Sequence, residues 1–318
     1  MTPNLQQIQE AHQRIIPYIH RTPILTSSTL NKMTGAALYF KCENFQKIGA
    51  FKIRGGMNAA LSLSPEKLKN GIATHSSGNH AQAIAYAAKI LGTKAYIVMP
   101  ENSPTVKINA VRGYGAEITF CAPNQAARES TLQQIVEATG AEFVHPYDDY
   151  RVITGQATCA KELIEDTDGL DVVIAPVGGG GLFSGTCLST HYLLPQAEIY
   201  AGEPEGAADA FLSLKSKKVQ KAEYVQTIAD GLLTTLSEKT FGIISQYARE
   251  ILLVNDDEIK AALRLVYERM KIVVEPSCVV PLAAVLRYPE KFAGKKVGMI
   301  FTGGNVDLSK VGEWFGGK

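Results

Sequence analysis

The sequence lacks the segments that direct a protein into or across a membrane. No apolar run approaches the roughly 18 residues needed to span a bilayer. The N-terminal residues have neither the basic nor the apolar region of a secretory signal. The five cysteines are scattered without C-x-x-C spacing, which is typical of free thiols in a reducing compartment. We therefore expect a cytoplasmic protein.

The sequence also lacks an excess of charge of either sign. Lys and Arg total 32 against 31 Asp and Glu, which gives a formal net charge of +1. Binding to nucleic acid or to an anionic membrane requires a basic surface, so neither is expected as a partner. With 318 residues, 46% hydrophobic and 20% charged, the chain is long enough for one large or two modest globular domains.

Strand and helix patterns alternate along the chain. The predicted strands are residues 37–42, 71–74, 95–99, 117–120, 142–144, 172–175, 198–201 and 297–301. The predicted helices are residues 5–16, 52–63, 81–88, 105–113, 125–138, 150–165, 183–194, 256–270 and 278–286. This alternation predicts an α/β fold with parallel, doubly wound sheets. Such sheets bind ligands at the carboxyl ends of their strands.

One lysine is distinguished by its neighbours. Lys52 lies between Phe51 and Ile53 in a segment that also contains three glycines. Apolar neighbours can desolvate a lysine, which lowers its pKa and leaves the free amine that attacks a carbonyl to form a Schiff base. Because most lysines are exposed surface residues, this interpretation depends on the other motifs of the chain.

Four consecutive glycines, Gly178–Gly181, stand between a predicted strand and a predicted helix. Their backbone N–H groups can turn toward one anion, and the helix N-terminus adds partial positive charge. The spacing matches neither G-x-G-x-x-G nor Walker A, which argues against a dinucleotide or ATP at this loop. We expect a phosphate site here, with a tight turn that binds no ligand as the alternative.

Two further polar segments lie at the end of a predicted strand. Ser76–His80 reads Ser-Ser-Gly-Asn-His and can hold a carboxylate, although a plain helix cap would also explain it. Thr302–Asn305 reads Thr-Gly-Gly-Asn and can place a hydroxyl near a ring nitrogen. Together with Lys52 and the glycines, these are the parts that a pyridoxal-phosphate site needs.

These motifs resemble those of the fold-type II pyridoxal-phosphate enzymes, the family of threonine dehydratase, serine racemase and cysteine synthase. The resemblance covers nearly the whole chain and is greatest to the eukaryotic serine racemase group. The matching segments are Phe51–Gly55, Ser76–His80, Gly178–Gly181, Glu275–Pro276 and Thr302–Asn305. It implies two doubly wound α/β domains of the tryptophan synthase β type. Residues 1–70 and 149–318 would form the large domain, and residues 71–148 the small inserted one.

The resemblance also implies a role for each motif residue. Lys52 would carry the cofactor as an imine and move the Cα proton on one face, and Ser77 would act on the opposite face. The cofactor would be bound by Phe51, Lys52, Asn79, Gly178, Gly179, Gly180, Gly181, Glu275 and Thr302. The substrate would be bound by Ser76, Ser77, Asn79, His80, Arg128 and Thr234. At position 302 the family usually has serine, and threonine keeps the hydroxyl.

The resemblance also implies a divalent-cation site in the segment Glu203–Asp209. Glu203 and Asp209 would supply carboxylates, and Ala207 would supply its backbone carbonyl. Ligands that are all oxygen suit Mg²⁺ or Ca²⁺. From the spacing alone, the acidic start of a helix is the simpler interpretation.

The family's nucleotide-activator site is matched only in part. Lys47, Gln82 and Tyr114 agree with it, but Ile48 stands where the family has a polar residue. The resemblance also implies a homodimer.

The resemblance implies racemisation of serine, together with elimination of water from serine and threonine to give a 2-oxo acid and ammonia. Ser77 favours the racemase, because catabolic threonine dehydratases usually carry alanine there. A threonine or L-threo-3-hydroxyaspartate dehydratase without racemase activity is the alternative. β-Replacement, as in cysteine synthase, fits the Ser-Ser-Gly-Asn-His segment less well. A non-enzymatic phosphate or nucleotide sensor would need the glycine loop alone.

Overall fold

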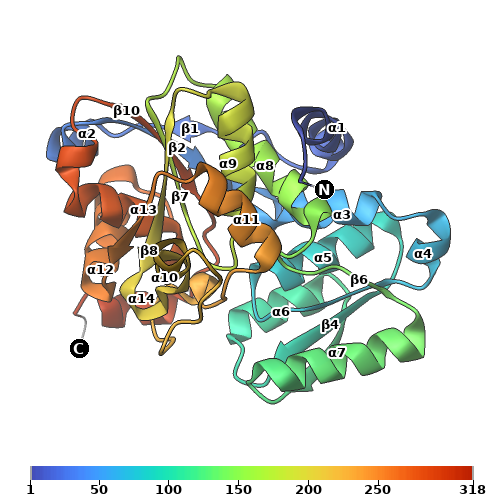
Figure 1. The fold of residues 1–318 in the computed structure, drawn as a ribbon. Coiled ribbons are helices and arrows are strands. Elements are labelled where there is room, and N and C mark those ends of the chain that lie inside the picture. The colour runs from blue at the N-terminus through green and yellow to red at the C-terminus, as the bar shows by residue number, and fades with distance from the viewer. Residues whose placement is uncertain (1, 317–318) are drawn as a thin grey trace.

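The computed structural model describes residues 2–316 and contains two β-sheets (Figure 1). The larger sheet has six strands in the order β1-β2-β10-β7-β8-β9. β1 pairs antiparallel with β2, and the other neighbouring pairs are parallel. The strands of this sheet are β1 Ile24–Leu25, β2 Ala37–Cys42, β7 Val172–Pro176, β8 Glu198–Pro204, β9 Glu250–Val254 and β10 Lys296–Phe301.

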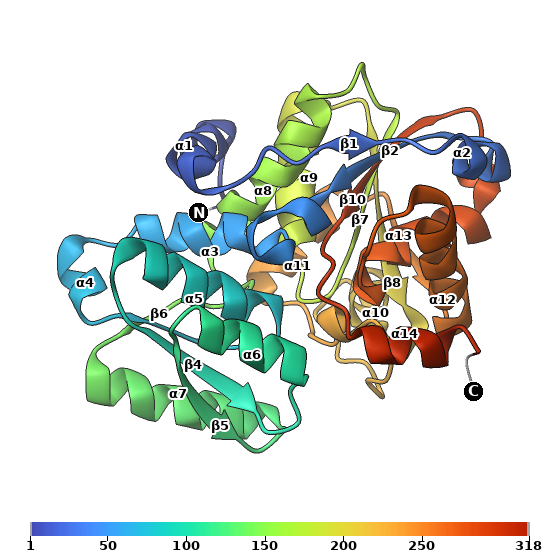
Figure 2. The same ribbon diagram turned by 180° about the vertical axis from the view of Figure 1, so that it is seen from behind.

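The smaller sheet is entirely parallel and has the order β5-β4-β3-β6. Its strands are β3 Ile72–His75, β4 Ala95–Pro100, β5 Glu117–Cys121 and β6 Glu142–Phe143. Figure 2 shows this sheet with α5, α6 and α7 in one lobe of the molecule, while α12 and α13 lie in the other lobe with the large sheet. The expected doubly wound α/β architecture is therefore confirmed.

The helices alternate with the strands as expected. In the first half they are α1 Leu5–Ile15, α2 Ser28–Thr34, α3 Lys52–Leu61, α4 Pro65–Lys69, α5 Asn79–Leu91, α6 Thr105–Gly113 and α7 Gln125–Thr139. In the second half they are α8 Tyr150–Glu165, α9 Gly181–Leu193, α10 Asp209–Ser216, α11 Glu238–Tyr247, α12 Asp256–Leu265, α13 Pro276–Arg287 and α14 Leu308–Trp314. No helix within residues 2–316 is long and apolar enough to cross a membrane.

The predicted helix over residues 256–270 needs a correction. The α-helix stops at Leu265, and Val266–Met270 continues as one turn of π-helix. The turn ends at Lys271, which has a positive φ of 60°. At the other end of α12, the Asn255 side chain caps the helix by accepting hydrogen bonds from the N–H groups of Asp257 and Glu258.

Pro65 follows soon after the end of α3 at Leu61. It is the first residue of the short helix α4, where its missing N–H is tolerated and its fixed φ suits the helix. The sequence patterns missed β1, β9, α2, α4, α10, α11 and α14. These elements are short or weakly patterned, and their packing against the rest of the chain stabilises them.

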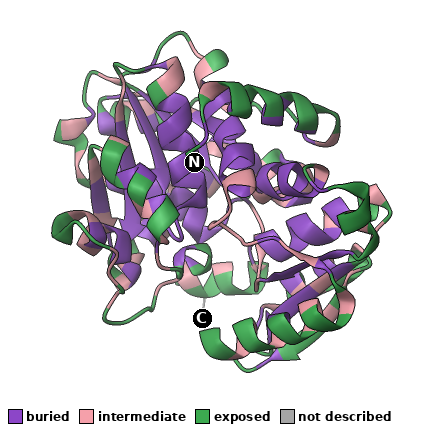
Figure 3. Cartoon of the chain, turned by 45° about the vertical axis from the view of Figure 1, so that its right-hand side comes forward, coloured by how far each residue is buried: buried purple, intermediate pink, exposed green. Residues whose placement is uncertain are grey.

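The core lies between the large sheet and the helices that cover it, where buried residues concentrate (Figure 3). All five residues of β7 are buried, as are five of the six in β10. Near-continuous apolar strands of this kind are typical of parallel sheets covered on both faces.

Glycines bring the central helices α3, α8 and α9 into close contact. A Cβ on Gly155 would lie 2.5 Å from the carbonyl oxygen of Arg54, and a Cβ on Gly185 would lie 2.6 Å from the backbone nitrogen of Ala157. Helix α3, which begins with Lys52, is thus held firmly against α8.

A buried cluster of charged residues adds a second connection between these elements. Arg54 donates to Glu43 and Glu162 at 2.7 Å each, while Lys41 is 2.7 Å and His12 is 3.0 Å from Glu162. Breaking a buried, hydrogen-bonded pair of this kind is strongly unfavourable, because the remaining charge is left unpaired. The cluster therefore fixes α3 relative to α1, α8 and β2.

Candidate active site

One pocket gathers all the residues expected to bind the cofactor or the substrate. It is lined by Phe51, Lys52, Ser76, Ser77, Asn79, His80, Arg128, Gly178, Gly179, Gly180, Gly181, Thr234, Glu275 and Thr302. These residues come from strand ends and helix starts of both sheets, as expected for a doubly wound fold. The structure shows their proximity, and their individual roles remain predictions.

Lys52 is the first residue of α3, and its amine is buried in the pocket. Its Nζ donates to the carbonyl oxygen of Pro146 at 3.1 Å and lies 5.3 Å from the centre of the Phe51 ring. Burial lowers the pKa of Lys52 to about 8, although the charge of Glu275 opposes the shift. The uncharged fraction of the amine near neutral pH is therefore much larger than in an ordinary lysine, although the charged form still predominates at pH 7.

The glycine loop Gly178–Gly181 ends at the N-terminus of α9. Gly180 has a φ of +87° and occupies the cap position, where no side chain bonds the first N–H groups of the helix. A Cβ on Gly179 would lie 2.4 Å from the ring of Tyr147. Larger residues are thus excluded, and the free N–H groups of the helix start form an anion site.

Thr302 follows β10 and supplies a buried hydroxyl. The residue is 3% exposed, and its Oγ1 has no hydrogen-bond partner within the described chain. Such orphaned groups are unfavourable unless a ligand or water completes them. A ring nitrogen that accepts a hydrogen bond would complete this one.

Asn79 is held by two neighbours that fix its amide. Its Nδ2 donates to Glu275 at 2.7 Å, and its Oδ1 accepts from Asn305 at 2.9 Å. The amide has two N–H groups, so one remains to donate to a ligand oxygen. Together with the desolvated amine, the anion cradle and the unpartnered hydroxyl of Thr302, this geometry fits pyridoxal phosphate.

The residues of the Ser-Ser-Gly-Asn-His segment differ in how far they are exposed to the pocket. Ser76 and Ser77 are partly exposed on the pocket wall. The His80 ring is 1% exposed, and its Nε2 is 3.2 Å from the carbonyl oxygen of Val144. Burial lowers the pKa of His80 well below its usual value, so the ring is neutral. The Nε2 of the ring is therefore engaged, whereas its Nδ1 has no partner among the described residues. The backbone N–H of His80 lies in the first turn of α5, where an anion can bind.

Arg128 contributes positive charge from α7 to the pocket. Its Nε is buried and has no hydrogen-bond partner among the described residues. Burial lowers the pKa of the nearby His75, and the charge of Arg128 lowers it further. A second anionic group on a ligand would find an unused donor here.

Two residues of the pocket have no counterpart in the sequence motifs. Lys107 of α6 donates to Asp230 at 2.6 Å and so connects the small-sheet lobe to the segment before α11. Burial raises the pKa of Glu275 to about 7, and the charge of Lys107 opposes this rise. Neither Lys107 nor Asp230 lies in a recognisable pattern, so only the folded chain reveals the pair.

The residues expected at the cation site lie outside this pocket. Both carboxylate oxygens of Glu203 accept N–H groups at the start of α10, and Asp209 accepts from Leu236 at 3.0 Å. Burial raises the pKa of Glu203 well above its usual value and that of Asp209 to about 7. Within the described residues no group of three or more His, Cys, Asp or Glu side chains can hold a metal ion, so a cation here would need backbone or water ligands as well.

Comparison with known proteins agrees with this geometry. The family model for pyridoxal-phosphate dependent enzymes matches residues 15–303. The chain belongs to this family. A serine racemase from Dictyostelium discoideum is 51% identical over 98% of this chain and 97% of its own length. A beta-hydroxyaspartate dehydratase from Paracoccus denitrificans is 50% identical over 97% of this chain and 98% of its own.

Solved structures of the pyridoxal-phosphate family share the whole fold. The crystal structure of the Dictyostelium discoideum serine racemase superposes with a TM-score of 0.92 and covers 97% of this chain and all of its own. A pyridoxal 5'-phosphate-dependent aspartate racemase has a TM-score of 0.91 at 37% identity, over 97% of each chain. The predicted cofactor family and fold are thus confirmed.

Proposed function

We propose that this protein racemises serine and also eliminates water from serine and threonine to give a 2-oxo acid and ammonia. The observation that carries this proposal is the presence of Lys52 and Ser77 in one pocket with the glycine cradle. The 51% identity to a serine racemase supports it.

Different residues of the pocket have different roles in the proposed reaction. Pyridoxal phosphate, when bound, supplies a conjugated ring that stabilises negative charge at the substrate Cα. Lys52 accepts the Cα proton, since its pKa of about 8 leaves a free amine near neutral pH. The Thr302 hydroxyl would donate a hydrogen bond to the ring nitrogen, and Asn79 would donate one to a ring oxygen. Ser76 and the N–H groups at the start of α5 orient the substrate carboxylate.

Racemisation requires a second proton-transfer group, because a proton removed from one face of Cα must be returned to the other. We propose Ser77 for this role. In Ser77→Ala we expect normal cofactor binding, measured by visible absorbance. We also expect loss of D-serine formation from L-serine, measured by chiral chromatography, and continued elimination, measured by a 2-oxo acid assay. Ser76→Ala is the matched control, since loss of a carboxylate contact lowers both reactions in parallel.

Two outcomes would contradict this assignment. D-serine formation at the parent rate in Ser77→Ala would remove Ser77 from the mechanism. Absence of D-serine from the parent protein would make it a dehydratase.

A second candidate substrate is L-threo-3-hydroxyaspartate. The unpartnered Nε of Arg128 favours a substrate with a second carboxylate, and the 50% identity to a beta-hydroxyaspartate dehydratase supports it. Parallel incubation with L-serine, L-threonine and L-threo-3-hydroxyaspartate compares the three. Arg128→Met should lower kcat/KM for the dicarboxylic substrate by about tenfold or more relative to serine, because a charge-assisted hydrogen bond is lost.

We further propose a divalent cation, Mg²⁺ or Ca²⁺, at Glu203, Asp209 and the carbonyl of Ala207. Burial raises the pKa of both Glu203 and Asp209, and this supports the site. A bound cation would offset the cost of burying two ionised carboxylates.

We also propose a nucleotide activator near Lys47, Gln82 and Tyr114. The side chain of Gln82 is 2% exposed, so only the other two residues present polar groups at the surface of the single chain. Activity measured with and without ATP tests this proposal.

We also propose a homodimer, a cytoplasmic location and a division into two domains. Light scattering in solution tests the dimer, and fractionation of cells tests the location. The small sheet is built wholly from residues 72–143, which supports a small inserted domain of residues 71–148. Residues 1–70 and 149–318 would form the large one. Hydrogen exchange that separates these two units would support the division.

A further inference from the structure

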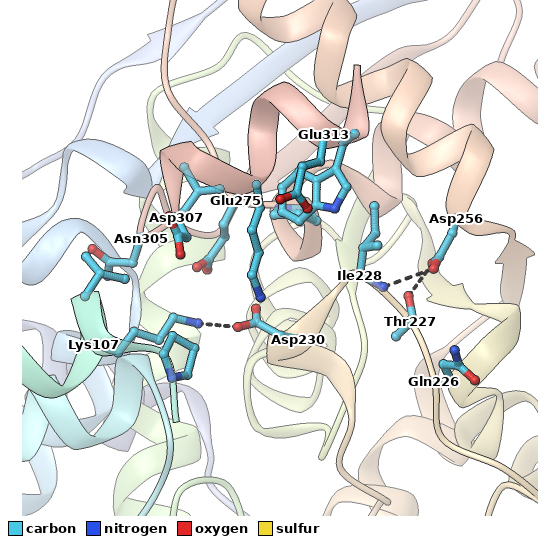
Figure 4. Close-up of a pocket in the computed structure, with 16 residues that line it drawn as sticks. Lys107, Gln226, Thr227, Ile228, Asp230, Asp256, Glu275, Asn305, Asp307 and Glu313 are labelled. Carbon is cyan, nitrogen blue, oxygen red and sulfur yellow. Dashed lines mark hydrogen bonds and ion pairs between the residues drawn. The ribbon is translucent and has the colours of Figure 1, made fainter. Parts of the chain in front are cut away.

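A second cavity lies beside the cofactor pocket. It has a volume of about 400 Å³ and is enclosed by the start of α6, the segment before α11, and helix α14 (Figure 4). Lys107, Asp230 and Glu275 line both spaces. The ion pair between Lys107 and Asp230 therefore forms part of the shared wall. The function proposed above makes no use of the second cavity.

The charged groups that face this cavity are mostly acidic. The carboxylates are Asp230, Asp256, Glu275, Asp307 and Glu313, and the amines are Lys107 and Lys310. Lys107 is paired with Asp230. Lys310 is thus the one amine left beside the other four acids. Burial raises the pKa of Glu275 to about 7, so this carboxyl is partly protonated near neutral pH, but the remaining three carboxylates still outnumber the amine and the cavity favours a cation.

Glu275 supplies a second and independent indication of a ligand. The residue is 3% exposed, and its Oε2 has no hydrogen-bond partner among the described residues. Figure 4 shows its carboxylate directed into the cavity, above the Lys107–Asp230 pair. An acceptor that is buried and unused is unfavourable unless a donor or cation completes it.

The remaining walls suit the apolar part of such a ligand. Trp314, the only tryptophan of the chain, lines the cavity together with Val106, Ile228 and Val306. Acidic groups beside an aromatic ring recognise alkylammonium ions, because the ring face attracts a cation. We propose that this cavity binds a small organic ammonium ion, with Trp314 as its aromatic wall and Glu275 as its buried acceptor.

Occupancy of this site would affect the active site through Glu275, one of the three residues that line both spaces. The Oε1 of Glu275 accepts the hydrogen bond that orients Asn79, while its Oε2 has no partner among the described residues. A cation bound to Glu275 would therefore alter the electrostatic potential at Asn79 and the strength of its hydrogen bond to Oε1. This coupling to turnover rests on the proposed function, whereas binding itself does not.

Tryptophan fluorescence of the cofactor-loaded protein tests the proposal, because the emission comes from Trp314 alone. Choline is the probe, since it has no primary amine and cannot react with the cofactor. Its uncharged isostere 3,3-dimethyl-1-butanol and sodium chloride are the controls. We expect a saturable change of emission with choline and none with either control.

Two variants test the location of the site. Glu313→Gln removes one cavity carboxylate and should raise the Kd for choline by about threefold, as expected for one screened ion pair. Glu290→Gln, an exposed acid that lines neither space, should leave the Kd unchanged.

Three results would overturn the proposal. They are a choline response that does not saturate, an equal response to the uncharged isostere, and equal effects of the two variants. Because none of these measurements depends on turnover, a failure here is distinguishable from a failure of the proposed function.

Discussion

At the residue scale, the most informative group is the amine of Lys52. Burial favours its uncharged form and lowers its pKa to about 8, whereas Glu275 favours the charged form. The shift is sufficient to make the amine reactive near neutral pH without removing its ability to hold a proton. A group that must both accept and return a proton needs a pKa near the working pH.

The first prediction concerns the pH dependence of cofactor loading. Only the uncharged amine of Lys52 attacks the cofactor carbonyl, so the loading rate of the apoprotein should rise with pH through a midpoint near 8. The measurement is the growth of the visible absorbance band after addition of pyridoxal phosphate. A midpoint near 10 would show that burial does not tune this lysine.

The matched variant for this prediction is Lys52→Ala. It should develop no visible band at any pH and should have no turnover, because no other residue presents an amine at that point of the pocket. Normal turnover in this variant would remove Lys52 from the mechanism.

At the scale of an element, the glycine loop before α9 shows how a backbone segment becomes a binding site. Gly179 packs against the ring of Tyr147 so closely that a Cβ would lie 2.4 Å from it. The loop lines the pocket, and no side chain caps the first N–H groups of α9, so these donors remain for a ligand.

The second prediction is that Gly179→Ala weakens cofactor binding. The added methyl group must displace the Tyr147 ring or the loop itself, so we expect the Kd for pyridoxal phosphate to rise about tenfold or more, as for a loss of roughly 1.4 kcal/mol. Titration of the apoprotein, followed by visible absorbance, measures it. Gly242→Ala is the control, because nothing lies within 4 Å of a Cβ at that helical position. Equal Kd values for both variants would refute the steric account.

The third prediction concerns how α3 is held against α8. Arg54→Met leaves Glu43 without its buried cation and removes one of the buried partners of Glu162, so we expect the free energy of unfolding to fall by about 3–5 kcal/mol. Arg264→Met removes an exposed pair with Glu268 and should cost less than about 1 kcal/mol. Urea unfolding measures both, and similar losses would mean that burial adds nothing to this interaction.

The same cluster affects the acid stability of the protein. Burial by itself raises the pKa of Glu162, but hydrogen bonds from His12 and Arg54 and the charge of Lys41 lower it overall. A carboxyl whose folded pKa is lowered stabilises the protein above its ordinary pKa and loses this contribution as the pH falls below it. The stability of Arg54→Met should therefore depend less steeply on pH in the acid range.

At the scale of the whole molecule, the fourth prediction concerns metal removal. A cation that binds only the folded state stabilises it, so EDTA should lower the melting temperature and Mg²⁺ or Ca²⁺ should restore it. The restoring effect should grow between pH 6 and pH 8, because the raised pKa of Asp209, about 7, means that a cation must displace a proton at the lower pH.

Two variants test whether the EDTA response depends on the proposed ligands or on any acidic residue of the same segment. Glu203→Gln should melt at the same temperature with and without EDTA. Glu205→Gln should keep the EDTA response, since Glu205 pairs with Arg287 at 2.6 Å and is not among the proposed ligands. An EDTA-insensitive parent protein, with metal removal verified, would count against a bound cation.

The sequence by itself determined the architecture and most of the active-site pocket. Alternating apolar strands and helical segments are local patterns, and so are Gly178–Gly181 and the polar segments at the strand ends. A parallel sheet necessarily brings its strand ends to one edge, so residues far apart in the chain were expected to meet there. Weakly patterned elements such as β1 and α14 were missed, because contacts with the rest of the fold stabilise them.

Only the tertiary structure decided the features that depend on the distance between remote side chains. Lys107 and Asp230 are 123 residues apart in the sequence. No local sequence pattern indicates that they form an ion pair in the wall between the two cavities. Three further features also depend on contacts between residues remote in sequence. They are the contact of the His80 ring with Val144, the unpartnered Oε2 of Glu275 and the position of Trp314 in the cavity wall. Local patterns report backbone periodicity, whereas burial, pKa shifts and unpaired groups arise only when the folded chain excludes water.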